Sequence, residues 1–129
     1  MKEKLKIAFV CVHNSCRSQI AEALGKKFMS DCYEFYSCGT KLKPQINQDA
    51  VRLMKDIYHI DMEQDQYSKL VKDIPEVDIV ISMGCEVGCP YIGKSFDNNW
   101  NLEDPTGKSD DDFIKIIYKI EEKIKQLNY

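Results

Sequence analysis

Hydrophobic residues in the first half of the chain alternate between short continuous runs and helical spacing. Residues 5–12 are nearly all apolar, as in a strand that is buried on both faces of a sheet. Polar residues 13–19 follow. Apolar side chains then recur at helical spacing and predict an amphipathic helix: Ile20, Ala21, Leu24 and Phe28. Residues 34–39 predict a short second strand that ends at a glycine.

The second half of the chain continues the same alternation. Pro44 and Asn47 introduce a second helix, with Ala50, Val51, Met54, Ile57 and Tyr58 at helical spacing. Residues 77–82 are rich in β-branched side chains and predict a third strand, and residues 98–102 predict a short fourth one. We expect one short helix near residues 67–72. The last helix shows the clearest periodicity: Phe113, Ile116, Ile117, Ile120, Ile124 and Leu127.

Strands that alternate with helices predict an α/β fold with a small parallel four-stranded sheet flanked by helices. The chain has 129 residues, without an internal repeat or linker, so we expect residues 1–129 to form a single domain. Asn47 stands near the expected start of the second helix. Ser109, followed three residues later by Asp112, resembles a capping box at the start of the last one.

Composition and charge exclude several classes of function. The net charge of −3 comes from 18 basic and 21 acidic residues spread along the chain, so we expect no nucleic-acid partner. No stretch approaches the roughly 20 apolar residues of a membrane helix, so we expect no membrane partner. Residues 1–12 resemble the opening of a signal peptide, but the apolar run is too short and lacks a cleavage pattern. We therefore expect a cytoplasmic protein.

The strongest chemical signal is a C-x5-R-S element between the first strand and the first helix. A loop that ends at a helix N-terminus presents unpaired backbone N–H groups and the positive end of the helix dipole, which together bind a tetrahedral oxyanion. The same field favours a thiolate at Cys11. We expect the oxyanion to be bound by Val12, His13, Asn14, Ser15, Cys16, Arg17 and Ser18.

Individual side chains of this loop have distinct expected tasks. Arg17 can add a bidentate clamp on the anion. Ser18 can donate a hydrogen bond to the Cys11 sulfur, and Asn14 tolerates the left-handed backbone of a tight loop. The alternative is that Cys11 is a small buried residue at a strand end. The strand before it and the helix after it favour the oxyanion loop.

Cysteines supply the second chemical signal. The six of them stand at positions 11, 16, 32, 38, 85 and 89, and in a reducing compartment such thiols are more often buried, metal-bound or catalytic than disulfide-bonded. A zinc site at Cys85 and Cys89 would need two further ligands, and His13 and His59 are the only histidines. A redox pair fits better, and we expect no metal. Four residues span about 13 Å in a strand but about 6 Å in a helical turn, so an oxidised 85–89 segment must be coiled or looped.

The run IAFVCVHNSCRSQIAEAL, residues 7–24, resembles the phosphate loop and first helix of the low-molecular-weight tyrosine phosphatase superfamily. Within it, residues 13–15 and 17–19 are more similar to the arsenate-reductase branch of that superfamily. The resemblance continues at residues 36–39, 83–90 and 104–107 and so spans almost the whole chain. It implies the phosphatase-like, flavodoxin-like three-layer sandwich.

The resemblance also implies a set of roles. Cys11 would be the nucleophile that attacks arsenate, and Asp104 the general acid that protonates the leaving oxygen. Cys85 and Cys89 would relay the resulting disulfide outward, to be reduced by thioredoxin, although many relatives have more residues between these two cysteines. Phosphate and sulfate would compete for the loop. No organic cofactor or metal is implied.

Two other functions use the same loop. A phosphatase would act through a Cys11 phosphoenzyme, but Thr106 and Gly107 beside the acid, where phosphatases of this family carry aromatic residues, disfavour a bulky aryl substrate. A phosphocarrier or anion-binding module would use the loop without turnover.

Overall fold

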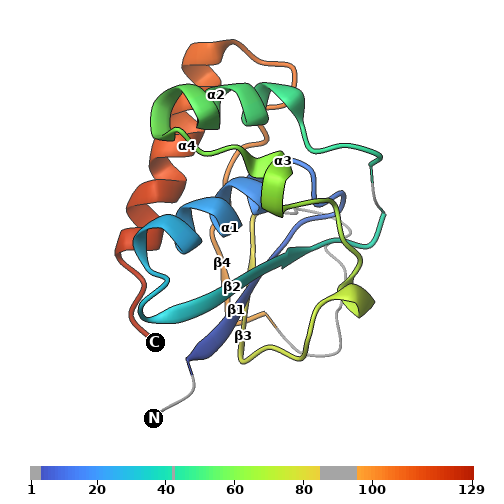
Figure 1. The fold of residues 1–129 in the computed structure, drawn as a ribbon, viewed down its shortest axis with the longest axis vertical. Helices are drawn as coiled ribbons and strands as arrows, with labels where there is room; N and C mark the ends of the chain where they lie inside the picture. The colour runs from blue at the N-terminus through green and yellow to red at the C-terminus, as the bar shows by residue number, and fades with distance from the viewer. Residues whose placement is uncertain (1–3, 42, 85–95) are drawn as a thin grey trace.

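Four parallel strands form one sheet in the order β2-β1-β3-β4 (Figure 1). The computed structural model describes residues 4–41, 43–84 and 96–129. Its elements are β1 (Leu5–Val10), α1 (Arg17–Phe28), β2 (Tyr33–Cys38), α2 (Gln48–Tyr58), α3 (Met62–Asp65), the 3₁₀ helix η1 (Val71–Asp73), β3 (Ile79–Ser82), β4 (Asn98–Asn99) and α4 (Asp110–Lys125). The predicted fold class is confirmed.

The sheet is buried on both faces because successive side chains of a strand point to opposite sides. Ile7 and Phe9 of β1 belong to the main core, which is closed by α1 and by the apolar side of α4 (Figure 1). Val10 lies on the other face. There it packs with Cys38 and Val80 under Val71, Ile74, Val77 and Phe96. The continuous apolar run of the first strand follows from this burial on both sides.

The order of the strands fixes where a ligand can bind. From β1 the chain passes through α1 to β2 on one side, whereas β3 pairs with the opposite edge of β1. In open parallel sheets, ligands bind at the carboxyl ends of the strands where the order reverses. In this sheet that point lies between β1 and β3, which are followed by Cys11 and by Met83.

Both expected helix starts are present. Asn47 Oδ1 accepts hydrogen bonds from the N–H groups of Asp49 and Ala50, and Ser109 Oγ accepts one from the N–H of Asp112. These bonds satisfy donors that the first turn of a helix leaves without a partner. Across the described ranges, no helix combines the length and apolar character needed to cross a membrane.

The short helix expected near residues 67–72 is wrong for most of its length. Only residues 71 and 72 lie in a helical turn, the start of η1, while the chain between α3 and η1 is extended and forms a bridge from Leu70 to Gly39. The N–H of Gly39 donates to Lys69 O, and the N–H of Val71 donates to Gly39 O. This pairing with the end of β2 outweighs the local preference for helix.

The fourth strand is shorter than the expected residues 98–102. It comprises only Asn98 and Asn99, because Asn101 adopts a left-handed backbone with φ 50° that interrupts the regular ladder. Leu102 nevertheless donates its N–H to Met83 O at 3.0 Å. The irregular segment thus stays attached to the chain that leaves β3.

Candidate active site

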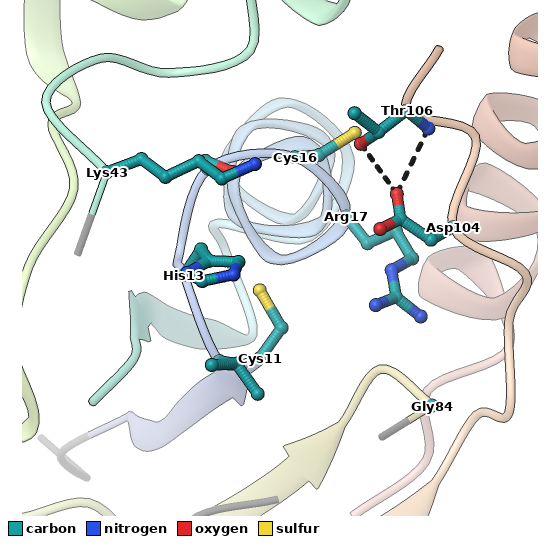
Figure 2. Close-up of a pocket in the computed structure, with 10 residues that line it drawn as sticks. Cys11, His13, Cys16, Arg17, Lys43, Gly84, Asp104 and Thr106 are labelled. Carbon is teal, nitrogen blue, oxygen red and sulfur yellow. Dashed lines mark hydrogen bonds between the residues drawn. The ribbon is translucent and has the colours of Figure 1, made fainter. Parts of the chain in front are cut away.

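A pocket of about 450 Å³ opens at the carboxyl ends of β1 and β3 (Figure 2). It brings together segments that are far apart in the sequence: the loop after β1, the loop after β2, the end of β3 and the segment before α4. Its lining residues are Cys11, Val12, His13, Ser15, Cys16, Arg17, Lys43, Gly84, Asp104 and Thr106. Most of the expected site residues therefore face one cavity. Cys85 and Cys89 lie outside the described residues.

The chain that follows β2 holds the loop after β1 in place. Val12 O accepts hydrogen bonds from the N–H groups of Thr40 and Lys41, both 3.0 Å long. A Cβ atom at Gly39 would lie only 2.5 Å from Val12 O, so any other residue there would displace the loop. Asn14 has φ 49°, which confirms the expected left-handed turn.

The loop offers free hydrogen-bond donors. The backbone N–H groups of residues 12–18 donate no hydrogen bond to any other residue that the structure describes. Buried or half-buried backbone donors are nearly always satisfied in native proteins. A run of such donors, where α1 contributes the positive end of its dipole, is suited to bind the oxygens of a tetrahedral anion.

A chain of hydrogen bonds behind the loop orients the Cys11 sulfur. The backbone N–H of Lys69 donates to Asn14 Oδ1 at 2.8 Å, which fixes the orientation of that side-chain amide. Asn14 Nδ2 then donates to Ser18 Oγ at 2.9 Å. The Ser18 proton is therefore left to donate to Cys11 Sγ, 2.8 Å away. The expected contact between Ser18 and Cys11 is confirmed, and its direction suits a thiolate.

Arg17 joins the loop to the opposite wall of the pocket. Its Nη1 atom donates to Leu102 O at 2.7 Å and to Met83 O at 3.1 Å, while the guanidinium also lines the pocket (Figure 2). Gly84 makes this arrangement possible, because a Cβ atom there would lie 2.7 Å from the backbone of Leu102 and 3.1 Å from Arg17 Nη1. The Nη1 atom of the guanidinium is thus bound to two backbone carbonyl groups, and the remaining N–H donors are available to an anion.

Asp104 is a carboxylate at the rim of the pocket. Its Oδ1 accepts hydrogen bonds from Thr106 Oγ1 at 2.7 Å and from the Thr106 N–H at 3.0 Å (Figure 2). Partial burial raises the pKa of Asp104, but these two bonds and the charges of Arg17 and Lys43 outweigh burial and hold the pKa below its ordinary value. Asp104 is therefore ionised at neutral pH.

The second cysteine of the loop stays protonated. Cys16 is 4% exposed, and burial, with Asp104 and Cys11 nearby, raises the pKa of its thiol to about 12. A protonated thiol is a poor nucleophile, because the thiolate is the reactive form. Of the other two described cysteines, Cys38 is buried in the sheet and Cys32 is exposed on the surface.

His13 is fixed in one tautomer. Its Nδ1 atom lies 2.7 Å from Lys41 O, and a carbonyl oxygen can only accept, so Nδ1 carries the proton. In the neutral ring, Nε2 is then an acceptor.

A buried ion pair supports the loop from behind. Lys69 Nζ lies 3.3 Å from Glu22 Oε1 and donates to Tyr67 O at 3.0 Å, and the side chains of Lys69 and Glu22 are only 9% and 3% exposed. Ser37 Oγ donates to the same carboxylate oxygen at 2.6 Å, and Lys26 pairs with its other oxygen. The position of Asn14 depends on this network through the backbone of Lys69.

Lys69→Met is expected to lower the free energy of unfolding by about 3 kcal/mol, because it leaves Glu22 buried with fewer partners. Chemical denaturation measures the change, and Lys72→Met, at an exposed lysine three residues away, should lie within about 0.5 kcal/mol of wild type. Equal stabilities of the two variants would contradict a structural role for the ion pair.

Sequence reasoning did not find Lys43, Lys69 or the role of Thr106. Lys43 reaches the pocket from an irregular loop, and Lys69 is buried by the extended segment that was expected to be helical. Asp104-Pro105-Thr106 did carry a signal, since the side chain of an Asp in a turn commonly accepts a hydrogen bond from the backbone N–H two residues on.

The geometry defines a class: an α/β protein with a loop of free backbone donors, suited to a tetrahedral oxyanion, beside a cysteine sulfur at the switch point of a parallel sheet. The model of the low molecular weight phosphotyrosine protein phosphatase family matches residues 6–128, and the chain belongs to this family.

Arsenate reductases are among the proteins most similar to this chain. The chain is 32% identical over 133 residues to an arsenate reductase of Bacillus cereus (strain AH187), covering 99% of this chain and 97% of that protein. The structure matches that of an arsenate reductase in the phosphate binding state, with a TM-score of 0.81, 31% identity and 95% coverage of both chains. It also matches a thioredoxin-dependent arsenate reductase of Corynebacterium glutamicum, with a TM-score of 0.71, 28% identity and coverage of 97% of this chain and 60% of the other.

Proposed function

We propose that this protein reduces arsenate to arsenite in the pocket around Cys11. The observation that carries the proposal is the run of free backbone N–H groups at residues 12–18, beside a cysteine whose sulfur accepts a hydrogen bond from Ser18. Such a loop binds phosphate and arsenate alike, because both are tetrahedral oxyanions. The similarity to arsenate reductases over nearly the full length favours arsenate as the substrate.

In the first step, the Cys11 thiolate attacks arsenic(V), and one arsenate oxygen leaves as water. Arg17 and the loop amides hold the remaining oxygens. Asp104 delivers a proton to the leaving oxygen, and it must first gain that proton because its low pKa keeps it ionised at neutral pH. A bound anion raises the pKa of Asp104, so this carboxylate can take up a proton from solvent; that proton and the one already on the arsenate oxygen make the leaving group water.

In the second step, the thiolate of Cys85 attacks the sulfur of Cys11. The electron pair of the sulfur–arsenic bond passes to arsenic, which leaves as arsenite, and the two thiols are oxidised to a Cys11–Cys85 disulfide. Gly84, which precedes Cys85 in the sequence, lines the pocket of Cys11, and this supports the assignment.

In the third step, Cys89 attacks Cys85 and releases the Cys11 thiolate. The Cys85–Cys89 disulfide is then reduced by the dithiol of thioredoxin, as the similarity to a thioredoxin-dependent arsenate reductase suggests. This coupling requires a reducing compartment, and we therefore propose the cytoplasm as the location. The scheme uses no metal and no organic cofactor.

The test is arsenite formation with thioredoxin, thioredoxin reductase and NADPH, compared with glutathione and glutaredoxin. We expect turnover with the thioredoxin system, competitive inhibition by phosphate and sulfate, and little hydrolysis of an aryl phosphate, because no aromatic side chain flanks Asp104. Steady phosphate release from the aryl phosphate without arsenite formation would instead make the protein a phosphatase acting through a Cys11 phosphoenzyme. A stable phosphocysteine passed to a partner would indicate a phosphocarrier.

A further inference from the structure

We infer that Lys43 is a second cationic ligand of the oxyanion, facing Arg17 across the pocket, and that it makes the site selective for doubly charged anions. This inference rests on the proposed function, since it concerns the anion that the same pocket binds.

The position of Lys43 is the first argument. The residue belongs to the irregular chain between β2 and α2, yet its side chain lines the pocket with Cys11 and Asp104. Figure 2 shows this side chain extending over the loop toward Cys16, from the side opposite Asp104. Arg17 approaches from the other wall, where the carbonyl groups of Met83 and Leu102 anchor it.

The second argument is that the ammonium group of Lys43 has no partner among the described residues. Within the described part of the chain, Lys43 forms no hydrogen bond, ion pair or ring contact. By contrast, Lys69, Lys26 and Lys108 are all paired with carboxylates. An ammonium group that lines a pocket without a protein partner is available to a bound anion.

The charge balance of the pocket is the third argument. In the proposed mechanism Cys11 reacts as a thiolate. Together with the carboxylate of Asp104 it brings two negative charges, which Arg17 alone cannot neutralise. The formal charge counts His13 as neutral. With Lys43 the lining residues reach formal neutrality, and the backbone donors of the loop then give the anion a net attraction. The charge of Lys43 already acts in the pocket, where it contributes to the low pKa of Asp104.

Selectivity follows from the physics of the contact. The Coulomb energy between the ammonium and an anion is proportional to the charge of the anion. Lys43 therefore stabilises a dianion twice as strongly, in free energy, as a monoanion of the same shape. A lysine also acts as a compact point charge and does not impose the planar geometry that Arg17 imposes.

The test uses protection of Cys11 from iodoacetamide, which needs no turnover. Sulfate and perchlorate are tetrahedral probes with charges of −2 and −1, and peptide mapping reports the alkylation of Cys11 at constant ionic strength. For Lys43→Met we expect the half-protecting sulfate concentration to rise about tenfold and that of perchlorate only about threefold, because the losses scale with charge. Lys43→Arg should stay within about twofold of wild type. Lys55→Met, which removes an exposed lysine of α2, should do the same.

Arsenate kinetics provide the second measurement. Lys43→Met should raise the KM for arsenate about tenfold and leave kcat within about twofold, because the ammonium binds the ground state and the transition state alike. If sulfate protects Cys11 equally well in Lys43→Met and in wild type, or not at all in wild type, the inference is overturned even where arsenate is reduced. If protection weakens as expected but wild type forms no arsenite, Lys43 remains an anion ligand and the proposed function fails.

Discussion

Arg17→Lys is expected to lower kcat/KM for arsenate by about 10²–10³-fold, the loss typical of removing a preorganised oxyanion donor. The positive charge is kept, but the geometry is lost. The Nη1 atom of Arg17 donates hydrogen bonds to the carbonyl groups of Leu102 and Met83. The guanidinium still presents a planar pair of donors to the pocket. A lysine ammonium cannot satisfy both carbonyl groups and also hold an anion in two places.

The measurement is the initial rate of arsenite formation, with circular dichroism to confirm the fold. The matched control is Arg52→Lys, because Arg52 is the other arginine of the chain and pairs with Asp110 and Asp49 on the surface. Its kcat/KM should stay within about twofold of wild type, as a surface ion pair contributes little. An Arg17→Lys variant with the efficiency of wild type would mean that Arg17 only begins the helix.

Much of the fold follows from the sequence pattern. A continuous apolar run indicates a strand buried on both faces, and β1 with Val10 and Phe9 on opposite sides is such a strand. Helical periodicity located α2 and α4 because each of them buries one side. It also located α1, although residues 18–25 of that helix are buried all round. The extended chain around Lys69 could not be predicted in this way, because its conformation depends on bonds to Gly39 and Asn14, which are distant in the sequence.

The same distinction applies to the site. The oxyanion loop is local in sequence, so that its spacing and its position before a helix were enough to identify Cys11, Arg17 and Ser18. Lys43 and the carbonyl groups that anchor Arg17 are brought to the loop only by the folded chain. No sequence periodicity encodes such contacts. The proposed Cys85 and Cys89 lie outside the described residues, and their roles stay predictions.

The Cys85→Ser and Cys89→Ser variants are expected to stop the proposed reaction at different points. Cys85→Ser should form almost no arsenite, because no internal thiol then displaces arsenic from Cys11. The neighbouring thiol of Cys16 cannot replace it, since burial raises its pKa to about 12 and keeps it protonated. Cys89→Ser should release about one arsenite per enzyme and then stall with thioredoxin, because only an attacking thiolate with access to the disulfide can continue the exchange.

A single turnover without reductant separates these outcomes. After quenching and peptide mapping, we expect an 85–89 disulfide in wild type, an 11–85 disulfide in Cys89→Ser and free Cys11 or its arsenic adduct in Cys85→Ser. Cys32→Ser, at an exposed cysteine away from the pocket, is the control and should match wild type. The stall expected for Cys89→Ser depends on how well thioredoxin can reach the disulfide. Cys11 is only 5% exposed in its pocket, so a large protein reductant cannot easily reach a disulfide to this residue. If Cys89→Ser turns over with thioredoxin as fast as wild type, the relay ends at Cys85, and an external thiol must resolve the Cys11–Cys85 bond directly.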